Sequence, residues 1–160
     1  MIGSIDRPLL DMGFLGELIG YQIRLVQIAA YKDFEAVTKG FGKAPRYFGL
    51  LSLIEENPGL PQGKLAEAVH LVRSSLVPII DKLEAEGIVE RRSSKDDRRL
   101  KAVWLTTKGK RVLMRLRPYV AAHEEVLTAG MSHGDKGMLL RLLRRVDSNL
   151  RDRKKMSEVA

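Results

Sequence analysis

Residues 81–109 read DKLEAEGIVERRSSKDDRRLKAVWLTTKG, and this stretch decides the fold. Residues 81–86 continue a helix that Gly87 ends, because glycine readily adopts the left-handed conformation found just after a helix. Two short runs suited to strands follow, at 89–93 and 99–105, with a polar turn between them. Thr106 then suits the N-cap of another helix. The order helix, hairpin, helix predicts a winged helix with its wing at 88–105.

The predicted hairpin is strongly basic. Residues 58–118 contain 14 Lys and Arg against 7 Asp and Glu, whereas 1–57 contain 6 against 7 and 119–160 contain 8 against 6. Most of the net charge of +8 therefore lies around the wing. This is the electrostatic footprint of a nucleic-acid binder, although a generally basic surface remains an alternative. The basic wing residues are Arg91, Arg92, Lys95, Arg98, Arg99 and Lys101.

The rest of the chain is predicted to be helical. Helices 61–69 and 73–86, separated by a three-residue turn, have helix-turn-helix spacing. Pro118 is expected to kink its helix, and Ser132 with Asp135 forms a capping-box-like start for the last one. The expected fold is mainly α with a small β-wing, in a single domain spanning 1–160. The predicted helices are 10–39, ended by Gly40 and Gly42, then 44–56, 61–69, 73–86, 106–129 and 132–154.

Composition excludes several classes of protein. The chain has no cysteine, which removes disulfides, thiolate nucleophiles and cysteine metal sites. Its 3 histidines are scattered, and no nucleophile lies at catalytic spacing from a base. We therefore expect no enzymatic activity, no metal site and no cofactor. No apolar run is long enough to span a membrane and the N-terminus lacks signal-peptide order, so a cytoplasmic location is expected.

The outer helices indicate a partner. The first helix is long, and the last one carries a leucine-rich face that a small core does not cover. A second copy of the chain is the expected cover, since two-fold dimers are the commonest assembly. Such a homodimer would place two recognition helices about one helical turn of DNA apart, ready to read a palindrome.

The segment LAEAVHLVRSSLVPIIDKLEAEGIVERRSSKDDRRLKAVWLTTKG resembles the core of the MarR family of bacterial winged-helix regulators. The matching motifs are D-x-L-E-x-x-G at 81–87, Arg91, D-x-R at 97–99 and L-T-x-x-G at 105–109. The order of helices is similar too, so the resemblance covers nearly the whole chain.

The resemblance implies an obligate homodimer that binds double-stranded DNA. Dimerisation would use 10–43 and 107–156, and the winged helix-turn-helix would span 44–106, with the recognition helix at 73–87. That helix would enter the major groove, while Arg99, oriented by Asp97, would probe the minor groove. The expected DNA-binding residues are Arg73, Ser74, Ser75, Val77, Pro78, Arg91, Lys95, Asp97, Arg98, Arg99 and Lys101.

Each of these assignments has a structural alternative. Ser74 and Ser75 are also good N-cap residues, and the Asp97 and Arg99 pair also suits an exposed turn. Val77 and Pro78 depart from the family, which usually has polar residues there. Base readout is therefore expected to depend on Arg73, the serines and apolar contacts with thymine methyl groups.

His70 stands where the family tends to have glycine. Such a turn position often requires a positive φ, which histidine tolerates better than a β-branched residue does. We therefore expect a structural role for His70, with a left-handed backbone in the turn before the recognition helix.

Members of the family commonly respond to small aromatic anions bound between the dimerisation helices and the winged helix. The related regulators bind either a free aromatic acid or its coenzyme A thioester. Arg46 next to Tyr47 joins a fixed positive charge to an aromatic face, which suits such a ligand. Ordinary core packing is the alternative for each aromatic residue. The candidate effector-binding residues are Tyr21, Arg24, Tyr31, Arg46, Tyr47, Phe48, Trp104 and His123.

The leading hypothesis is a dimeric transcriptional repressor, released from a palindromic operator by an aromatic acid or its coenzyme A thioester. The alternative is a winged-helix module for protein–protein contact that does not bind DNA. Salt-dependent DNA affinity separates the two hypotheses.

Overall fold

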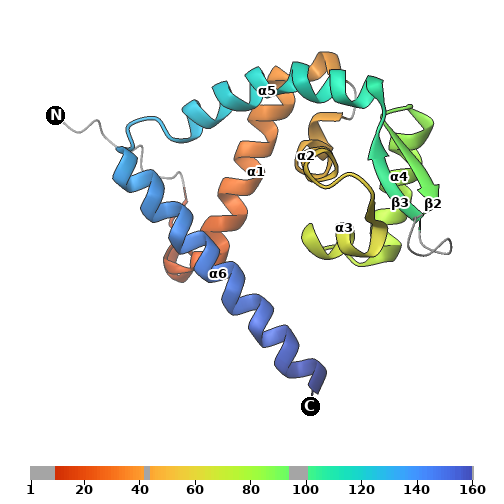
Figure 1. Cartoon of the computed structure of the whole chain (residues 1–160). Helices are drawn as coiled ribbons and strands as arrows, with labels where there is room; N and C mark the ends of the chain where they lie inside the picture. The colour runs from red at the N-terminus through yellow and green to blue at the C-terminus, as the bar shows by residue number, and fades with distance from the viewer. Residues whose placement is uncertain (1–9, 42–43, 94–100, 160) are drawn as a thin grey trace. The chain divides into compact units, whose positions relative to one another are not determined.

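The computed structural model describes residues 10–41, 44–93 and 101–159, and Figure 1 shows their helices and strands. The chain divides into two compact units, Met1–Ala121 and Ala122–Ala160. The boundary falls inside helix α5 (Thr107–Leu127).

The N-terminal region departs from the predicted continuous helix over 10–39. It begins with the 3-10 helix η1 (Gly13–Glu17), and Leu18 is then extended (φ −82°, ψ 115°) before α1 (Ile19–Val37). The prediction was wrong because Gly13 adopts a positive φ of 46° and further glycines lower the helix propensity of this stretch.

The end of α1 also differs from the prediction. The helix stops before Thr38, whose buried hydroxyl donates to the carbonyl oxygen of Phe34 at 2.6 Å. Thr38, rather than the predicted Gly40, therefore follows the last residue of the helix. Gly42 lies outside the described residues. The short 3-10 helix η2 (Lys39–Phe41) follows.

The next segment contains the predicted helix-turn-helix. This segment comprises η3 (Ala44–Tyr47), α2 (Phe48–Glu56), α3 (Gln62–Ala68) and α4 (Arg73–Ala85), and the last two form the helix-turn-helix. Two details of the prediction were wrong. Residues 44–47 form a 3-10 turn rather than the start of α2, and Pro61 lies in a short strand before α3. Both differences arise where proline removes a backbone donor near a helix start.

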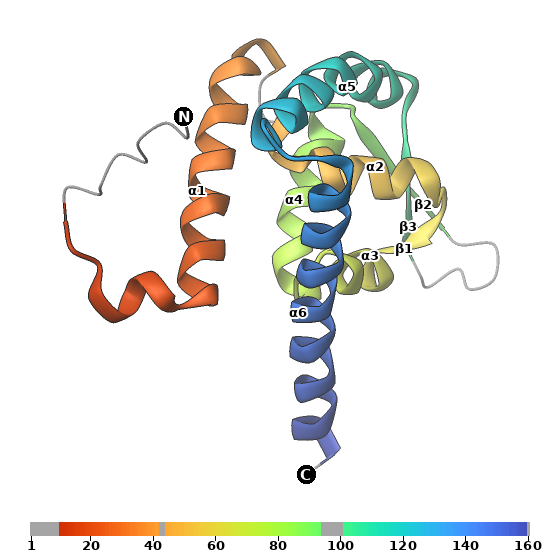
Figure 2. The ribbon, with the colours of Figure 1, turned by 90° about the vertical axis from the view of Figure 1, so that its left-hand side faces the viewer.

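The wing is a three-stranded antiparallel sheet in the order β1-β3-β2 (Figure 2). Strands β2 (Val89–Ser93) and β3 (Lys101–Leu105) pair from Val89 opposite Leu105 to Ser93 opposite Lys101. Strand β1 (Leu60–Pro61) pairs with β3 and was not predicted, because two residues carry no periodic pattern. The described parts of the two predicted strands are confirmed.

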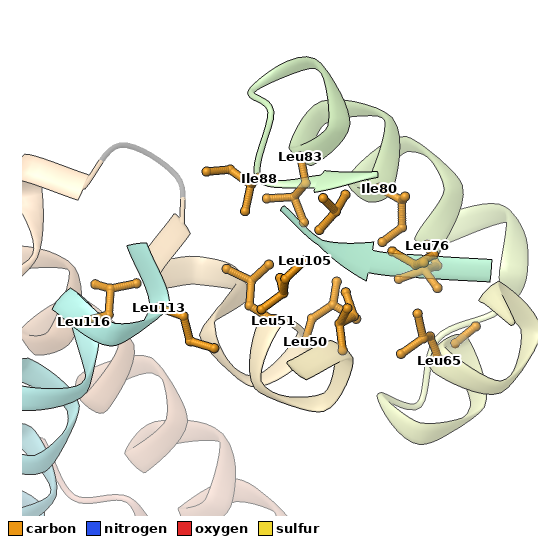
Figure 3. Packing of buried hydrophobic residues seen from close by; sticks show 14 residues of the cluster. Leu50, Leu51, Leu65, Leu76, Ile80, Leu83, Ile88, Leu105, Leu113 and Leu116 are labelled. Carbon is orange, nitrogen blue, oxygen red and sulfur yellow. The ribbon is translucent and has the colours of Figure 1, made fainter. Parts of the chain in front are cut away.

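The core of the first unit lies between α2, α3, α4, the wing and the start of α5. Figure 3 shows its side chains converging from these elements. Full burial of one such side chain stabilises the fold by roughly 1.5–3 kcal/mol. The largest fully buried apolar side chains are Leu51, Ile54, Leu65, Leu76, Ile80, Leu83, Val89, Val103, Leu113 and Leu116.

Two glycines in residues 81–109 are each required for a different physical reason. Gly87 ends α4 with φ 67°, which lets the amide of Ile88 donate back to the carbonyl of Leu83 at 2.8 Å. Gly109 lies so close to the wing that a Cβ there would stand 2.0 Å from the carbonyl oxygen of Ile88. Thr106 joins the two, since its hydroxyl donates to the carbonyl of Gly87 at 2.7 Å and accepts from the Gly109 amide at 3.0 Å.

The turn before the recognition helix contains the predicted left-handed histidine. His70 has φ 56°, the only positive φ of a non-glycine residue in the part of the chain that the structure describes. The amide of the following Leu71 donates to the carbonyl of Ala66 at 2.9 Å. The left-handed backbone at His70 lets the chain reverse its direction sharply and continue directly into α4.

The second unit consists of the end of α5 and helix α6 (His133–Val159). The predicted capping box is confirmed, because the Asp135 amide donates to the Ser132 hydroxyl at 3.2 Å and the Ser132 amide donates to the Asp135 carboxylate at 2.9 Å. The hydrogen bonds from Ser132 lower the pKa of the Asp135 carboxyl below its usual value. Among the helices described, none combines the length and apolarity that crossing a bilayer requires.

Candidate nucleic-acid interface

Helix α4 presents its first turn to solvent. The N-cap is Val72 and no side chain caps the helix, so the alternative reading of Ser74 and Ser75 as N-caps was wrong. Arg73, Ser74 and Ser75 are all exposed within the first turn. Their donors therefore lie at the start of the helix, where residues of a recognition helix contact base edges.

Pro78 lies in the interior of α4 and is exposed. Because proline has no amide hydrogen, the carbonyl of Ser74 one turn earlier lacks its usual helical partner. The buried Leu76, Ile80 and Leu83 hold the opposite face of the helix against the core. The helix thus continues through a proline that offers a base only apolar contact.

A shallow cavity of about 280 Å³ lies where α3, α4 and β3 begin. It brings together Arg73 and Lys101, both expected from the sequence, and adds Lys64, which was missed. Lys64 pairs with Glu67 at 3.1 Å, but its side chain is 68% exposed. The sequence signal that points to Lys64 is its position near the start of the first helix of the helix-turn-helix. The residues that line the cavity are Pro61, Gln62, Gly63, Lys64, Glu67, Arg73 and Lys101.

Arg91 and Arg92 are held by other protein groups. The guanidinium of Arg91 binds the carboxylates of Asp81 and Glu84, each at 2.5 Å, and its side chain is only 17% exposed. Arg92 lies over the Trp104 ring, 5.3 Å from its centroid, and pairs with Glu90. The phosphate contact expected of Arg91 thus competes with two carboxylates.

The remaining wing-tip assignments fall between the end of β2 and the start of β3 in the sequence. Lys95, Asp97, Arg98 and Arg99 lie outside the described residues and stay predictions. Val77 is half-buried on α4.

A second cavity, of about 530 Å³, lies at the C-terminal half of α1. It brings together three of the candidate effector residues, Tyr31, Arg46 and Tyr47. The sequence interpretation missed Thr38, Lys39 and Lys82. The full lining is Tyr31, Lys32, Phe34, Glu35, Ala36, Thr38, Lys39, Pro45, Arg46, Tyr47 and Lys82.

The charge of this second cavity is mainly positive. Lys32, Lys39, Arg46 and Lys82 face it, against the single carboxylate of Glu35. The Tyr31 hydroxyl donates to Glu35 at 3.5 Å. An anion with an aromatic body matches this lining, since cations and tyrosine rings surround one space.

The other candidate effector residues lie elsewhere. Tyr21 and Arg24 lie earlier on α1 and do not line the cavity. Phe48 packs against the core. Trp104 lies on the wing next to the buried Val103 and Leu105, and its ring packs against Gly59. His123 belongs to the second unit.

Comparison with known proteins supports the resemblance. The model of the MarR family matches residues 45–101. A protein named as a transcriptional regulator for the hcr operon of Thauera aromatica is 36% identical over 132 residues, which cover 82% of this chain and 79% of that protein.

Solved structures extend the similarity over the fold. The transcriptional repressor CouR bound to a 23-mer DNA duplex is 33% identical, with a TM-score of 0.79 over 86% of this chain and 98% of CouR. CouR has also been solved bound to p-coumaroyl-CoA, with 31% identity and a TM-score of 0.77 over 86% of this chain and 97% of CouR. PcaV from Streptomyces coelicolor, solved with its natural ligand, is 26% identical, with a TM-score of 0.77 over 87% and 98%. With its winged helix-turn-helix fold, the chain belongs to the MarR family of DNA-binding transcriptional regulators, which are not enzymes.

Proposed function

We propose that this regulator is a homodimeric repressor that binds a palindromic operator. The observation that carries the proposal is the exposed first turn of α4, which contains Arg73 and the two serines, and in which Arg73 lines one cavity together with Lys64 and Lys101. Polar donors on a recognition helix read bases, and flanking cations bind phosphates. The DNA-bound structure of the repressor CouR supports the same use. We propose the bacterial cytoplasm as the site of action of this regulator, because the operator DNA would be there.

Exposed apolar side chains support the homodimer. In the first unit, Phe14, Ile19 and Val26 are 73%, 66% and 61% exposed. In the second unit, α6 exposes several leucines and a neighbouring methionine. Patches of this kind mark interfaces, and a second copy of the chain offers the same patches in return. The exposed residues of α6 are Met138, Leu139, Leu140, Leu142, Leu143 and Leu150.

The cavity beside α1 is the proposed effector site. Its four cations and two tyrosines suit a small aromatic acid or the coenzyme A thioester of one. CouR, which has been solved with p-coumaroyl-CoA, supports this class of ligand. If the ligand releases the repressor, effector and operator must weaken each other's binding by the same factor.

The DNA proposal predicts a salt-dependent and sequence-dependent affinity. In a fluorescence-anisotropy titration of a labelled promoter duplex, log affinity should fall linearly with log salt, with a slope of about −0.9 per phosphate contact. Arg73→Ala should cost roughly 1–3 kcal/mol of operator binding and relax the preference at one base position per half-site.

Arg111→Ala is the charge-matched control, because it also removes one arginine. Arg111 lies in α5, beyond the C-terminal end of β3, whereas Lys101 is the first residue of β3. The Arg111→Ala variant should bind the operator as the wild type does. Affinity that is independent of salt, or equal for operator and random duplex, would overturn the DNA proposal in favour of a protein–protein module.

The effector proposal predicts ligand stabilisation that depends on Arg46. In thermal-shift titrations, a matching aromatic acid or thioester at 100 times its Kd stabilises the folded protein by about 2.7 kcal/mol. Arg46→Ala should lose most of this stabilisation, whereas Arg24→Ala, outside the cavity lining, should keep it. If the two variants showed equal thermal shifts, the ligand would not bind in this cavity.

A further inference from the structure

We propose that Arg91, Glu84 and Asp81 form a positioning cluster that locks the wing to the recognition helix, and that Arg91 serves DNA binding in this way rather than by contacting phosphate. The inference rests on the proposed operator binding and concerns how the reading surface keeps its shape. These residues belong to the wing and to α4, which lie side by side in Figures 1 and 2.

The guanidinium of Arg91 joins strand β2 to three positions of α4. Its Nη1 donates to Oε2 of Glu84 at 2.5 Å, and its Nη2 donates to Oδ1 of Asp81 at 2.5 Å. Nη2 also lies 3.4 Å from the carbonyl oxygen of Val77, one turn before Asp81. One planar group therefore spans two turns of the recognition helix, which fixes the strand along the helix as well as across it.

Glu84 also binds the backbone of the same strand. Its Oε1 accepts from the Arg91 amide at 2.8 Å while its Oε2 accepts from the guanidinium. Strand β2 lies at the edge of the sheet, and this amide donates to Glu84 rather than to β3. The carboxylate thus holds both the backbone and the side chain of Arg91.

A third element joins through Gln62, at the start of α3. With its amide oxygen oriented toward Arg91, Gln62 accepts from Nε at 2.9 Å and from Nη2 at 3.2 Å. Gln62 is only 5% exposed, so its amide needs such partners. The guanidinium of Arg91, which belongs to β2, therefore contacts α3 and α4, two of the elements that line the cavity containing Lys64, Arg73 and Lys101.

The charge of the cluster opposes direct phosphate binding. One guanidinium faces two carboxylates, so the group carries a net negative charge. Negative charge close to a DNA-binding surface weakens attraction for phosphates. The cluster therefore benefits DNA binding through geometry, by holding the first turn of α4 and the wing at the spacing that two grooves require.

The decisive test is Glu84→Gln, because the two explanations predict opposite signs. A change that removes a negative charge strengthens DNA binding if only Coulomb attraction matters. The positioning role instead predicts operator binding about 10-fold weaker, comparable to the loss of one charged hydrogen-bond pair. Non-specific affinity for random duplex should be kept, because phosphate contacts carry it. Glu86→Gln, which removes the same charge two residues later, should bind the operator as the wild type does.

Arg91→Lys and Arg91→Gln test the arginine. A positioning role predicts that both lose operator affinity to a similar extent, since one ammonium does not span two carboxylates and an amide. Glu84→Gln combined with Arg91→Gln should lose no more than Arg91→Gln alone, the non-additivity of residues that act as a unit.

The proposal is overturned if Arg91→Lys keeps wild-type affinity while Arg91→Gln lowers the salt slope by about 1, the signature of a phosphate contact. It is also overturned if Glu84→Gln binds the operator as well as or better than the wild type. Circular dichroism checks that each variant is folded, and Asp81→Asn replaces any variant that is not. Failure of the wild type to prefer its operator would instead refute the proposed function.

Discussion

Leu143→Glu is expected to give a monomer that binds the operator more than about 100-fold more weakly than the wild type, because linking two reading heads commonly raises affinity by that factor or more. Leu143 is 43% exposed on α6 and shares a helix face with Leu139 and Leu150. In a dimer this face would be buried, so a glutamate there would bring an unpaired charge into an apolar interface. Sedimentation velocity measures the mass, and anisotropy with the operator duplex measures the affinity.

Ser148→Glu is the matched control on the same helix. Ser148 is exposed and lies opposite the leucine face at helical periodicity, so the same new charge would stay in solvent. This variant should remain a dimer with wild-type affinity. A Leu143→Glu protein that still sediments as a dimer would remove α6 from the proposed interface.

Gly109→Ala is expected to destabilise the winged helix by about 3 kcal/mol, the upper part of the usual range for overpacking, and to lower Tm by roughly 6–12 °C. The residue lies in the first turn of α5, where alanine normally stabilises a helix relative to glycine. Here the added Cβ would stand 2.0 Å from the carbonyl oxygen of Ile88, so backbone must move. The hydrogen bonds of Thr106 to Gly87 and Gly109 would be strained by that movement.

Gly49→Ala is the control for this substitution. Gly49 lies in the first turn of α2, and a Cβ there meets no atom within 4 Å. Alanine should therefore raise stability, by up to about 1 kcal/mol, as helix propensity predicts. Differential scanning calorimetry measures the change in stability, and its sign, for each variant. Equal effects of the two substitutions would contradict the close contact between Gly109 and the wing.

Local chemistry made much of the fold predictable. Thr106, Ser132 and Asp135 cap helices because their short polar side chains reach nearby amides, and Gly87 ends α4 because it tolerates a positive φ. The same reasoning predicted the left-handed His70. In the N-terminal region, helical spacing of apolar residues extended the first helix too far, since periodicity does not register the break at Leu18.

The candidate sites were predictable only in part. Arg73 and Lys101 were expected to serve one function, and the structure brings them into one cavity. Lys82 was not expected near Tyr31 and Arg46, because these residues are separated by long stretches of chain and no local pattern links them. Trp104 was a candidate for the effector cavity, but the pairing of β1 with β3 places it against Gly59.

The sequence by itself determined the order of the main helices and of the two longer wing strands, the basic wing and the family, because helix stops, caps and hairpins depend on neighbours a few residues apart. The tertiary structure decided which partner each charged side chain takes. Arg91 appears in the sequence as one of several wing cations, yet Asp81 and Glu84 hold it at 2.5 Å. The physical reason is that ion pairing depends on distance in space, and only the packed fold brings β2 against α4.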